Sequence, residues 1–301
     1  MNSSKKLLYI ANLRLPTEKA YGIQIVKMCE AFSELGLGVE LVAPYRISKI
    51  KDDLFDYYGV RNIFIFKRIF SPDLYLPSKM NIIALGFKNL ISALILSVYA
   101  LIRRPDMVFS RDELPLFFLS FFRDRLVYEA HRFSNSRKIF YKRFINKKVK
   151  VVVITSQLKE DFLKLGFGLE NILVAPDGVD LEKFNTEISQ EEARLKIGLP
   201  LSKKIVVYNG HLFEWKGVYT LLETARLCPN VLFVFVGGTL RDIEVFKKKA
   251  ESMENVMILG HRPYKEMPIF LRSADVLVLP NSAKEEISRS YTSPLKLFEY
   301  M

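Results

Sequence analysis

Residues 203–217 read KKIVVYNGHLFEWKG and carry the clearest pattern in the chain. The apolar run at 205–208 has the composition of a buried strand and is followed by Gly210. A glycine at a strand end lets the backbone approach a ligand closely. The helical pattern that starts near Val218 offers unpaired N–H groups and the positive end of a helix dipole. Because Lys216 adds a full positive charge at this place, the stretch predicts a site for a phosphate or diphosphate.

This stretch differs from the two best-known phosphate-binding loops. It has neither the P-loop pattern nor GxGxxG, so a simple nucleotide hydrolase or a dinucleotide-binding protein is not indicated. Taken alone, the stretch also fits an ordinary strand-to-helix turn with a surface lysine. The remainder of the chain is needed to choose between these interpretations.

Apolar runs of strand length alternate with helical patterns on both sides of the stretch. A first series predicts strands at residues 7–11, 39–43, 62–66, 107–110, 126–129, 150–154 and 172–175, with helices at 23–34, 84–102 and 158–165. A second series predicts strands at 205–208, 232–236, 256–259 and 276–279, with helices after the first three. Continuous apolar strands separated by helices predict mainly parallel sheets covered on both faces.

The segment between the two series predicts a domain boundary. Residues 178–201 are rich in charged and turn residues, and Ser189 and Glu192 have the spacing of a capping box for a short helix. We therefore expect an α/β protein of two domains, residues 1–180 and 181–301. Two doubly wound domains that face a cleft would bind ligands at the carboxyl ends of their strands.

Composition narrows the class of protein. Half of the 301 residues are hydrophobic, which is enough for two cores. Cys29 and Cys228 lie far apart in expected helices, which argues against a disulfide scaffold and indicates a reducing compartment. The histidines and cysteines show no metal-ligand spacing, and there is no Asp-x-Asp motif. We therefore expect no metal and no cofactor.

The chain is strongly basic, with a formal net charge of +12. Its lysines and arginines are spread along the sequence, with short runs at 137–138, 142–143 and 147–148. No basic heptad helix, zinc finger or RNA-binding aromatic signature is present, so nucleic acid is not an expected partner. Most of these charges fit a solvated face, and an anionic membrane surface is the expected partner for the remainder.

Two apolar runs bear on membrane binding. Residues 90–102 read LISALILSVYALI, which is shorter than the roughly 20 residues of a spanning helix. A buried crossover helix is the favoured interpretation, and a helix resting partly on a bilayer beside Arg103 and Arg104 is the alternative. The run at 114–122 allows the same two interpretations. The N-terminal segment has the pattern of a first strand and not of a signal peptide, so we expect a cytoplasmic protein, peripheral on the inner face of the membrane.

Several segments together resemble the retaining GT-B glycosyltransferases of family 4. Residues 203–217 resemble the G-R-x-x-x-x-K-G segment of that family. Others follow in the expected order: LLYIANLRLPTEKAYGIQIVKMCEAF (7–32), YEAH (128–131), VVVITSQLKEDF (151–162), APDGVDLEKF (175–184), NVMILGHRPYKEMPIFLRSADVLVLPN (255–281) and SPLKLFEYM (293–301). The resemblance implies a GT-B fold, with an acceptor-side domain over residues 1–180 and a nucleotide-sugar-binding domain over 181–301.

The resemblance also implies roles for individual residues. Gly22, in the loop before the first helix, would present its backbone N–H to the diphosphate or the acceptor. His131, at a strand end, would lie close to the transferred sugar, and Lys216 would be the main phosphate partner. Gly210 would border the diphosphate, and the main chain at Arg262 would read the base. From the residues alone, Gly22 also fits a glycine at a helix start with no ligand, and a histidine at a strand end is more often structural.

Two positions depart from the family pattern. His211 stands where the family has an arginine, and a neutral imidazole lacks arginine's fork of donors. Tyr291 stands where the E-x7-E motif has its first glutamate, while Glu299 matches the second and would bind ribose hydroxyls. Recognition of the donor sugar is therefore open, with Ser293, Lys296 and the backbone N–H of Leu295 as candidates.

The resulting hypothesis is a retaining, metal-independent hexosyltransferase. It would move a hexose from a nucleotide sugar to a glycan or lipid-linked acceptor in polysaccharide or glycolipid synthesis. The alternatives are a GT-B sugar-nucleotide epimerase and a non-catalytic nucleotide-binding protein. The helical pattern at 293–301 has no stop signal. We therefore expect that the second domain is incomplete, that further strand and helices follow, and that residues 1–301 alone are inactive.

Overall fold

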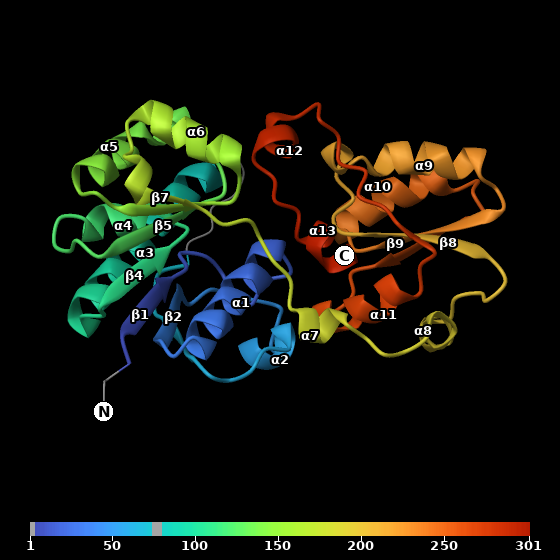
Figure 1. Cartoon of the computed structure of the whole chain (residues 1–301), viewed down its shortest axis with the longest axis horizontal. Helices are drawn as coiled ribbons and strands as arrows, with labels where there is room; N and C mark the ends of the chain where they lie inside the picture. The colour runs from blue at the N-terminus through green and yellow to red at the C-terminus, as the bar shows by residue number, and fades with distance from the viewer. Residues whose placement is uncertain (1–3, 74–79) are drawn as a thin grey trace. The chain divides into compact units, whose positions relative to one another are not determined.

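The computed structural model describes residues 4–73 and 80–301. The chain forms two compact units, Met1–Pro176 (unit 1) and Asp177–Met301 (unit 2). Each unit is an α/β layer structure built on one parallel sheet (Figure 1). The sequence pattern predicts the boundary at residue 180, a few residues further along the chain.

Unit 1 contains a sheet in the order β3-β2-β1-β4-β5-β6-β7. Its strands are β1 (Lys6–Ile10), β2 (Gly38–Pro44), β3 (Ile65–Ile69), β4 (Met107–Ser110), β5 (Leu126–Ala130), β6 (Lys150–Val153) and β7 (Ile172–Val174). Its helices are α1 (Ala20–Glu34), α2 (Leu54–Tyr58), α3 (Met80–Arg103), α4 (Glu113–Leu119), α5 (Lys138–Asn146) and α6 (Ser156–Leu165), with short 3-10 turns η1 (Asn135–Arg137) and η2 (Leu169–Asn171).

Unit 2 contains a sheet in the order β10-β9-β8-β11. Its strands are β8 (Lys204–Asn209), β9 (Val231–Val236), β10 (Val256–Gly260) and β11 (Val276–Leu277). Its helices are α7 (Leu181–Phe184), α8 (Gln190–Ile197), α9 (Val218–Leu227), α10 (Leu240–Ala250), α11 (Met267–Arg272), α12 (Glu286–Ser290) and α13 (Leu295–Tyr300), with 3-10 turns η3 (Glu214–Lys216) and η4 (Tyr264–Glu266).

The alternation of side chains along β8 builds a core on each face of the unit 2 sheet. Tyr208 points to one face, where α9 and α10 supply Val218 and Phe246. Ile205 and Val207 point to the other face and pack with Phe270 of α11. Figure 1 shows α9 and α10 on one side of this sheet and α8 and α11 on the other. Because successive side chains alternate, an apolar strand of this kind is stable only when both faces are covered.

All the strand pairings are parallel, so the carboxyl ends of neighbouring strands lie at one edge of each sheet. The register in unit 1 places Ile10 of β1 opposite Ser110 of β4. In unit 2, Asn209 of β8 lies opposite Val236 of β9. Segments that follow these strands therefore meet, whatever their separation in sequence.

The predicted strands occur close to their expected positions, with one clear shift. β3 is Ile65–Ile69 and not 62–66, because it is an edge strand whose residues are mostly exposed and give little apolar signal. The capping box of α8 is confirmed: the Ser189 hydroxyl accepts from the Glu192 N–H, and the Glu192 carboxylate accepts from the Ser189 N–H at 2.8 Å.

Helix α3 is the predicted crossover between β3 and β4, but it is buried on one face only. Ala93, Leu96 and Ala100 are fully buried, while Leu94 and Val98 are exposed. The expectation of a buried helix is therefore wrong for its outer face, since apolar composition alone does not distinguish a helix covered on all sides from one covered on a single side.

Candidate functional site

In unit 2, the carboxyl end of β8 is tied to helix α13. The Asn209 side-chain amide donates to Glu299 Oε2 at 3.2 Å. Its carbonyl oxygen accepts from the Tyr300 hydroxyl at 2.6 Å. Asn209 and Glu299 are both buried. These contacts hold the predicted ribose ligand Glu299 beside the strand end that carries Gly210.

Glycines at this strand end permit close backbone packing. Gly210 has φ +134° and donates its N–H to the Val236 carbonyl at 2.7 Å. Gly217, which has φ +75°, is the N-cap residue of α9. A Cβ atom at Gly217 would lie 1.7 Å from the Pro280 carbonyl oxygen, so no larger residue fits without displacement of the backbone. The requirement for glycine is therefore steric as well as conformational.

Two lysine side chains converge here. Lys216 lies in η3, directly before Gly217 and α9, with Nζ 3.9 Å from the centroid of the Trp215 ring. Lys296 of α13 has Nζ 4.3 Å from the centroid of Tyr208. A Cβ atom at Gly210 would lie 3.0 Å from that nitrogen. The Lys296 ammonium is shielded from solvent, and none of the residues that the structure describes forms a hydrogen bond with it.

The environment opposes the charge on both amines. Burial lowers the pKa of Lys216 to about 8. Burial, together with the positive charge of Lys216, lowers the pKa of Lys296 to about 7, against the opposing effect of Glu299. Burial also raises the pKa of Glu299, despite hydrogen bonds with Asn209 and Tyr264 and the nearby charge of Lys296. The site thus holds more potential positive charge than the surrounding protein balances.

His211 follows Gly210 in a loop of aromatic residues. Its backbone carbonyl accepts from the Tyr208 hydroxyl at 2.7 Å. Its ring stacks on Phe213, with centroids 4.9 Å apart and planes 10° apart, and Phe213 in turn stacks on Trp215. Stacking on Phe213 therefore fixes the plane of the imidazole.

The remaining predicted residues of unit 2 lie around this centre in different ways. The Ser293 hydroxyl accepts from the backbone N–H of Asp177 at 2.9 Å, which gives it a structural role. Leu295 is the first residue of α13. Arg262 is exposed after β10, and β10 is separated from β8 by β9. The structure therefore brings together Gly210, His211, Lys216, Lys296 and Glu299.

In unit 1, His131 directly follows β5, as the sequence predicted. Its Nε2 lies 2.8 Å from Glu129 Oε1, and that carboxylate also accepts from Gln24 at 2.6 Å and from the Tyr9 hydroxyl at 3.0 Å. Burial opposes the charge of Glu129, but the contact with His131 and the charge of Arg111 outweigh it, so the pKa of Glu129 is lowered. An ionised Glu129 orients the imidazole.

Gly22 is not in a loop before the first helix. It lies in the first turn of α1, which begins at Ala20, and its N–H donates to the Lys19 carbonyl at 2.9 Å. A Cβ atom at Gly22 would lie 2.1 Å from the Tyr58 hydroxyl oxygen. The proposed N–H contact with a ligand is therefore wrong, since this N–H is already bonded and the glycine makes room for Tyr58. The helix start was missed because Lys19 provides no side-chain cap.

Sequence reasoning missed the residues that position the predicted ones. Glu129 belongs to the YEAH segment. The pattern that could have pointed to it is a carboxylate inside an otherwise apolar strand. Asn209, Tyr264 and Tyr300 converge on Glu299 from separate elements. Their spacing in the sequence does not predict that these side chains meet, because they belong to elements that are far apart in the chain.

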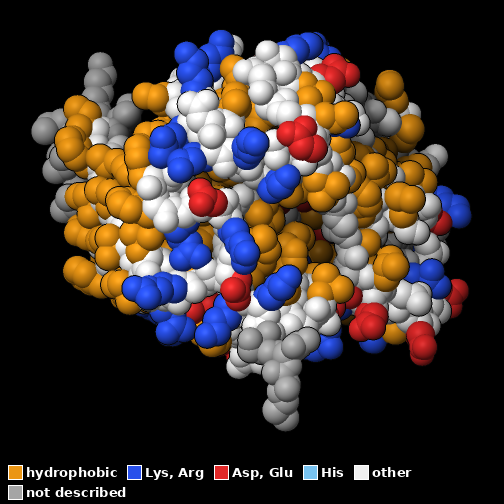
Figure 2. All heavy atoms as spheres, turned by 60° about the vertical axis from the view of Figure 1, so that its left-hand side comes forward, with side chains coloured by type: hydrophobic (Ala, Val, Ile, Leu, Met, Phe, Trp, Pro, Cys, Tyr) orange, Lys and Arg blue, Asp and Glu red, His pale blue; other side chains and the backbone are white. Residues whose placement is uncertain are grey.

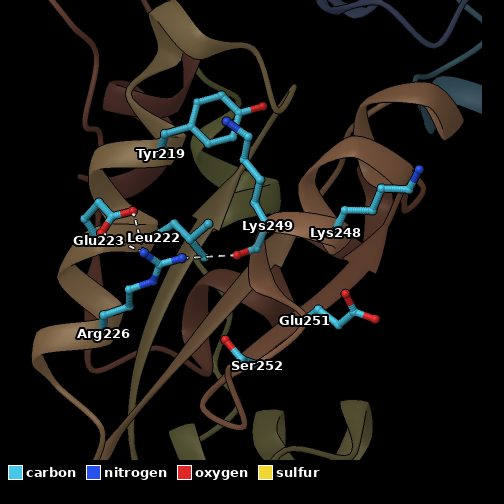
Figure 3. Close-up of a pocket in the computed structure, with 8 residues that line it drawn as sticks. All are labelled: Tyr219, Leu222, Glu223, Arg226, Lys248, Lys249, Glu251 and Ser252. Carbon is cyan, nitrogen blue, oxygen red and sulfur yellow. Dashed lines mark hydrogen bonds and ion pairs between the residues drawn. The ribbon is translucent and has the colours of Figure 1, made fainter.

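A hollow of about 650 Å³ lies elsewhere on unit 2, between α9 and the end of α10 (Figure 3). Figure 3 shows Arg226 bridging to Glu223 and to the backbone of Lys249, and Lys249 reaching over Tyr219. None of the predicted site residues is among those that line it. Arg226 is held by these contacts within the hollow, and no sequence motif points to it, so it does not replace the strand-end site as a candidate.

Metal binding has no support among residues 4–73 and 80–301, where no three His, Cys, Asp or Glu side chains are grouped closely enough to hold an ion. The candidate cations at the β8 end are the two lysines.

Most of the unit 2 sequence is similar to a known protein family. Residues 189–292 match the family model described as glycosyl transferases group 1. This range includes the strand-end loop with Gly210, His211 and Lys216. The match therefore relates this part of unit 2 to glycosyl transferases group 1.

Curated relatives match part of the chain. A glycosyltransferase assigned to teichuronic acid biosynthesis, TuaC of Bacillus subtilis (strain 168), is 29% identical over 145 residues, covering 47% of this chain and 35% of its own length. The D-inositol 3-phosphate glycosyltransferase of Corynebacterium urealyticum is 27% identical, covering 50% of this chain and 40% of its own length. The UDP-Gal:alpha-D-GlcNAc-diphosphoundecaprenol alpha-1,3-galactosyltransferase of Escherichia coli is 31% identical, covering 36% and 30%. The matches thus span well under half the length of these relatives.

Solved structures resemble the fold over most of the chain. Anabaena HepE in complex with UDP and glucose has a TM-score of 0.64 at 16% identity, covering 91% of this chain and 73% of its own. Sucrose-phosphate synthase from Thermosynechococcus elongatus has a TM-score of 0.69 at 15% identity, covering 92% and 75%. UDP-GlcNAc 2-epimerase from Neisseria meningitidis has a TM-score of 0.62 at 13% identity, covering 90% and 76%. The fold is therefore GT-B, and the fold alone does not separate transferases from epimerases.

Proposed function

We propose that this chain transfers a hexose from a nucleoside diphosphate sugar to a glycan or lipid-linked acceptor, with retention of the anomeric configuration and without a metal ion. The family match supports transfer of a glycosyl group. Two relatives support the donor and acceptor classes by name: the Escherichia coli galactosyltransferase uses UDP-Gal and a diphosphoundecaprenol-linked sugar, and the Streptococcus pneumoniae relative is an alpha-galactosylglucosyldiacylglycerol synthase.

The observation that carries the proposal is the pair of shielded amines at the end of β8. Lys216 and Lys296 lie close enough for one charge to lower the pKa of the other. A buried positive charge without a partner is unfavourable, so the site gains free energy when an anion enters. A diphosphate has enough negative charge to engage both amines. It would also lie near Gly217 at the start of α9, where helix N–H groups favour anions.

These groups suit departure of a nucleoside diphosphate. The bond from the anomeric carbon to the phosphate oxygen breaks, and negative charge grows on the diphosphate. Lys216, Lys296 and the α9 N-terminus would stabilise that charge where it develops. The acceptor oxygen forms the new bond to the anomeric carbon, and its proton passes to the departing phosphate oxygen. The amines thus supply the electrostatic stabilisation that this step needs.

Other predicted residues would contact the ribose, the base and the transferred sugar. Glu299 accepts hydrogen bonds from ribose hydroxyls, since each carboxylate oxygen can accept more than one bond. The main chain at Arg262 reads the base, as the resemblance implies. His131, oriented by Glu129, contacts the transferred sugar. The stacked ring of His211 donates a single hydrogen bond or none, so Lys296 supplies the second cation in place of the family's arginine.

The test has a binding step and a product step. A panel of UDP-, GDP- and ADP-hexoses is screened by thermal shift, because a ligand that binds the folded state raises the melting temperature. The best donor is then incubated with lipid-linked and glycan acceptors, and products are identified by mass spectrometry. A glycosylated acceptor supports the proposal. An isomerised nucleotide sugar formed without acceptor would favour the epimerase, and tight binding without any product would favour a non-catalytic protein.

A further inference from the structure

The outer face of α3 carries an apolar stripe. Six exposed apolar residues recur along it at helical spacing, and we call them the α3 stripe: Ile83, Phe87, Leu90, Leu94, Val98 and Ile102. An ordinary surface helix presents charged and polar residues to water and buries its apolar face. Here both faces are apolar, and only the inner one is covered by unit 1. A contiguous exposed apolar surface of this kind indicates an interaction site.

The inner face of α3 is fastened to the sheet layer by polar contacts. The Ser92 hydroxyl bonds to Asn12 Oδ1 at 2.5 Å, and the Lys88 ammonium pairs with Asp73 at 2.8 Å. Within the described residues, α3 is long and apolar enough to cross a membrane by length and composition. A spanning orientation would break these contacts and leave their charged and hydroxyl groups in hydrocarbon. The helix is therefore suited to lie along a surface.

A phenylalanine turn adjoins the C-terminal end of α3. Phe121 and Phe122 follow α4 and are both exposed. The turn is attached to the α3–β4 connection because the Arg123 guanidinium donates to the Pro105 carbonyl. It is also attached to α5, because the Arg143 guanidinium lies 4.0 Å from the Phe121 ring centroid. Helices α3, α4 and α5 pack in that order, so the stripe and the turn belong to one layer of unit 1.

Basic residues gather at the same end of this layer. The α3 helix ends at the amino ends of β4, β5 and β6, where Arg104, Arg125, Lys148 and Lys150 are exposed. We call these four residues the basic edge. Figure 2 shows hydrophobic side chains gathered along one side of the visible face, with lysine and arginine side chains beside them. Apolar side chains bordered by cations match the acyl boundary and the anionic headgroups of a bilayer.

We propose that unit 1 docks on an anionic membrane surface through the α3 stripe and the phenylalanine turn, with the basic edge in contact with lipid headgroups. The partner is a lipid bilayer, because a bilayer offers an apolar layer for the stripe and an anionic headgroup layer for the basic edge beside it. The inference does not depend on the proposed function, since the site at the end of β8 belongs to unit 2.

The experiment is co-sedimentation of the full chain with phosphatidylcholine vesicles, with and without phosphatidylglycerol, at low and high salt. The test variant is Leu94→Gln with Val98→Gln, which removes apolar area without a change in charge at two residues that are 43% and 54% exposed. The matched control is Leu227→Gln with Leu240→Gln, at two exposed leucines of unit 2. A charge variant, Arg104→Asn with Lys148→Asn, removes two positive charges of the basic edge. Asparagine is chosen because it tolerates the positive φ of 49° and 50° at these positions.

We expect binding to anionic vesicles that weakens with salt. The stripe variant should bind at least about tenfold more weakly, because two inserted side chains are lost. The control should bind like the parent, and the charge variant should lose the preference for anionic vesicles. Equal binding by the stripe variant and the parent would overturn the proposal. So would a salt-stable dimer that the stripe variant converts to monomer, or resistance to alkaline extraction, which would indicate a spanning helix.

Nucleotide binding measured on the same preparations separates this inference from the proposed function. Donor binding that persists in a stripe variant without vesicle affinity shows an intact unit 2 and assigns the loss to the α3 surface. Loss of both would show that the substitutions disturb folding, and then Phe122→Ser replaces them as the test because Phe122 lies in a turn and is exposed.

Discussion

Lys216 occupies a position where its charge has little compensation. Burial lowers its pKa to about 8, and its ammonium lies over the Trp215 ring. We expect Lys216→Ala to lower glycosyl transfer about 10²–10³-fold, as is common when one stabiliser of a developing charge is removed. Circular dichroism should show an unchanged fold, because the ammonium fills no part of the core. The measurement is initial rate at saturating acceptor.

The control for this substitution is Lys248→Ala, which removes an exposed lysine from α10. It lowers the net charge by the same amount and should retain the parent rate. If Lys216→Ala and Lys248→Ala had equal rates in folded protein, Lys216 would not be part of the site.

Lys296 gives the site a pH dependence with a definite sign. Its pKa of about 7 in the unliganded protein leaves the amine mostly neutral at pH 8. A bound diphosphate favours the charged amine and raises this pKa, so binding at pH 8 must take up protons. Affinity therefore falls as pH rises above 7. Calorimetry of UDP binding in two buffers of different ionisation enthalpy measures the uptake.

Lys296→Met keeps the length of the side chain and removes the titrating group. We expect most of the proton uptake at pH 8 to disappear in this variant, with Lys216 accounting for the rest. Unchanged uptake in Lys296→Met, or none in the parent, would exclude Lys296 as a partner of the diphosphate.

For single residues, the sequence indicated which side chains lie at the end of β8 better than it indicated the contacts that hold them. Gly210, Lys216 and Glu299 could be placed because each stands in a short segment whose local pattern is recognisable in the sequence. The pairing of Lys296 with Lys216 could not, because the two are 80 positions apart and meet only through the tie between Asn209 and α13. Gly22 was misplaced because α1 starts without a capping side chain.

Among the elements, the junction of η3 and α9 depends on Gly217. Its φ of +75° is unfavourable for a residue with a Cβ, and that atom would meet the Pro280 carbonyl at 1.7 Å. We expect Gly217→Ala to destabilise unit 2 by more than the roughly 1–2 kcal/mol that a left-handed alanine costs. Urea denaturation followed by Trp215 fluorescence measures the free energy of unfolding.

Gly198→Ala is the matched control, since Gly198 has φ +71° at the end of α8 and a Cβ added there would have no atom within 4 Å. Gly198→Ala adds only the strain of a left-handed backbone, so the loss in free energy of unfolding should stay at roughly 1–2 kcal/mol. Equal costs at the two positions would mean that the contact with Pro280 relaxes freely and that the junction is not constrained.

The positions of strands were predicted best where the strands are fully buried. β1, β4 and β5 are central strands with strong apolar runs, and they lie within one residue of their predicted positions. The edge strand β3 shifted because its residues are largely exposed. The position of helix α3 was predicted correctly, but its burial was not. Neither the periodicity nor the composition of an apolar helix indicates which face the fold leaves exposed.

The two units of the chain have separate sheets and separate polar centres. Each centre lies at the carboxyl ends of parallel strands, with His131 after β5 in unit 1 and Gly210 after β8 in unit 2. The sequence predicted this arrangement because alternating strands and helices allow few other architectures. It did not predict which residues each centre would orient, because those residues come from distant segments.

The single tryptophan makes the two units separately observable. Trp215 lies in unit 2, directly beside Lys216, so its fluorescence reports the melting of unit 2, while far-ultraviolet circular dichroism reports both units. A nucleoside diphosphate at 100 times its Kd stabilises the unit that binds it by about 2.7 kcal/mol. We therefore expect UDP, or whichever diphosphate the panel selects, to raise the fluorescence-detected melting temperature by several degrees. The circular dichroism curve should split into a shifted and an unshifted component, because unit 1 does not contain the two amines. Lys216→Ala should remove the shift, whereas Lys248→Ala should keep it.

Two other outcomes would contradict this expectation. A ligand that shifts both probes by the same amount would show that the chain unfolds as one cooperative body. A ligand that shifts only the circular dichroism signal would place the diphosphate site in unit 1.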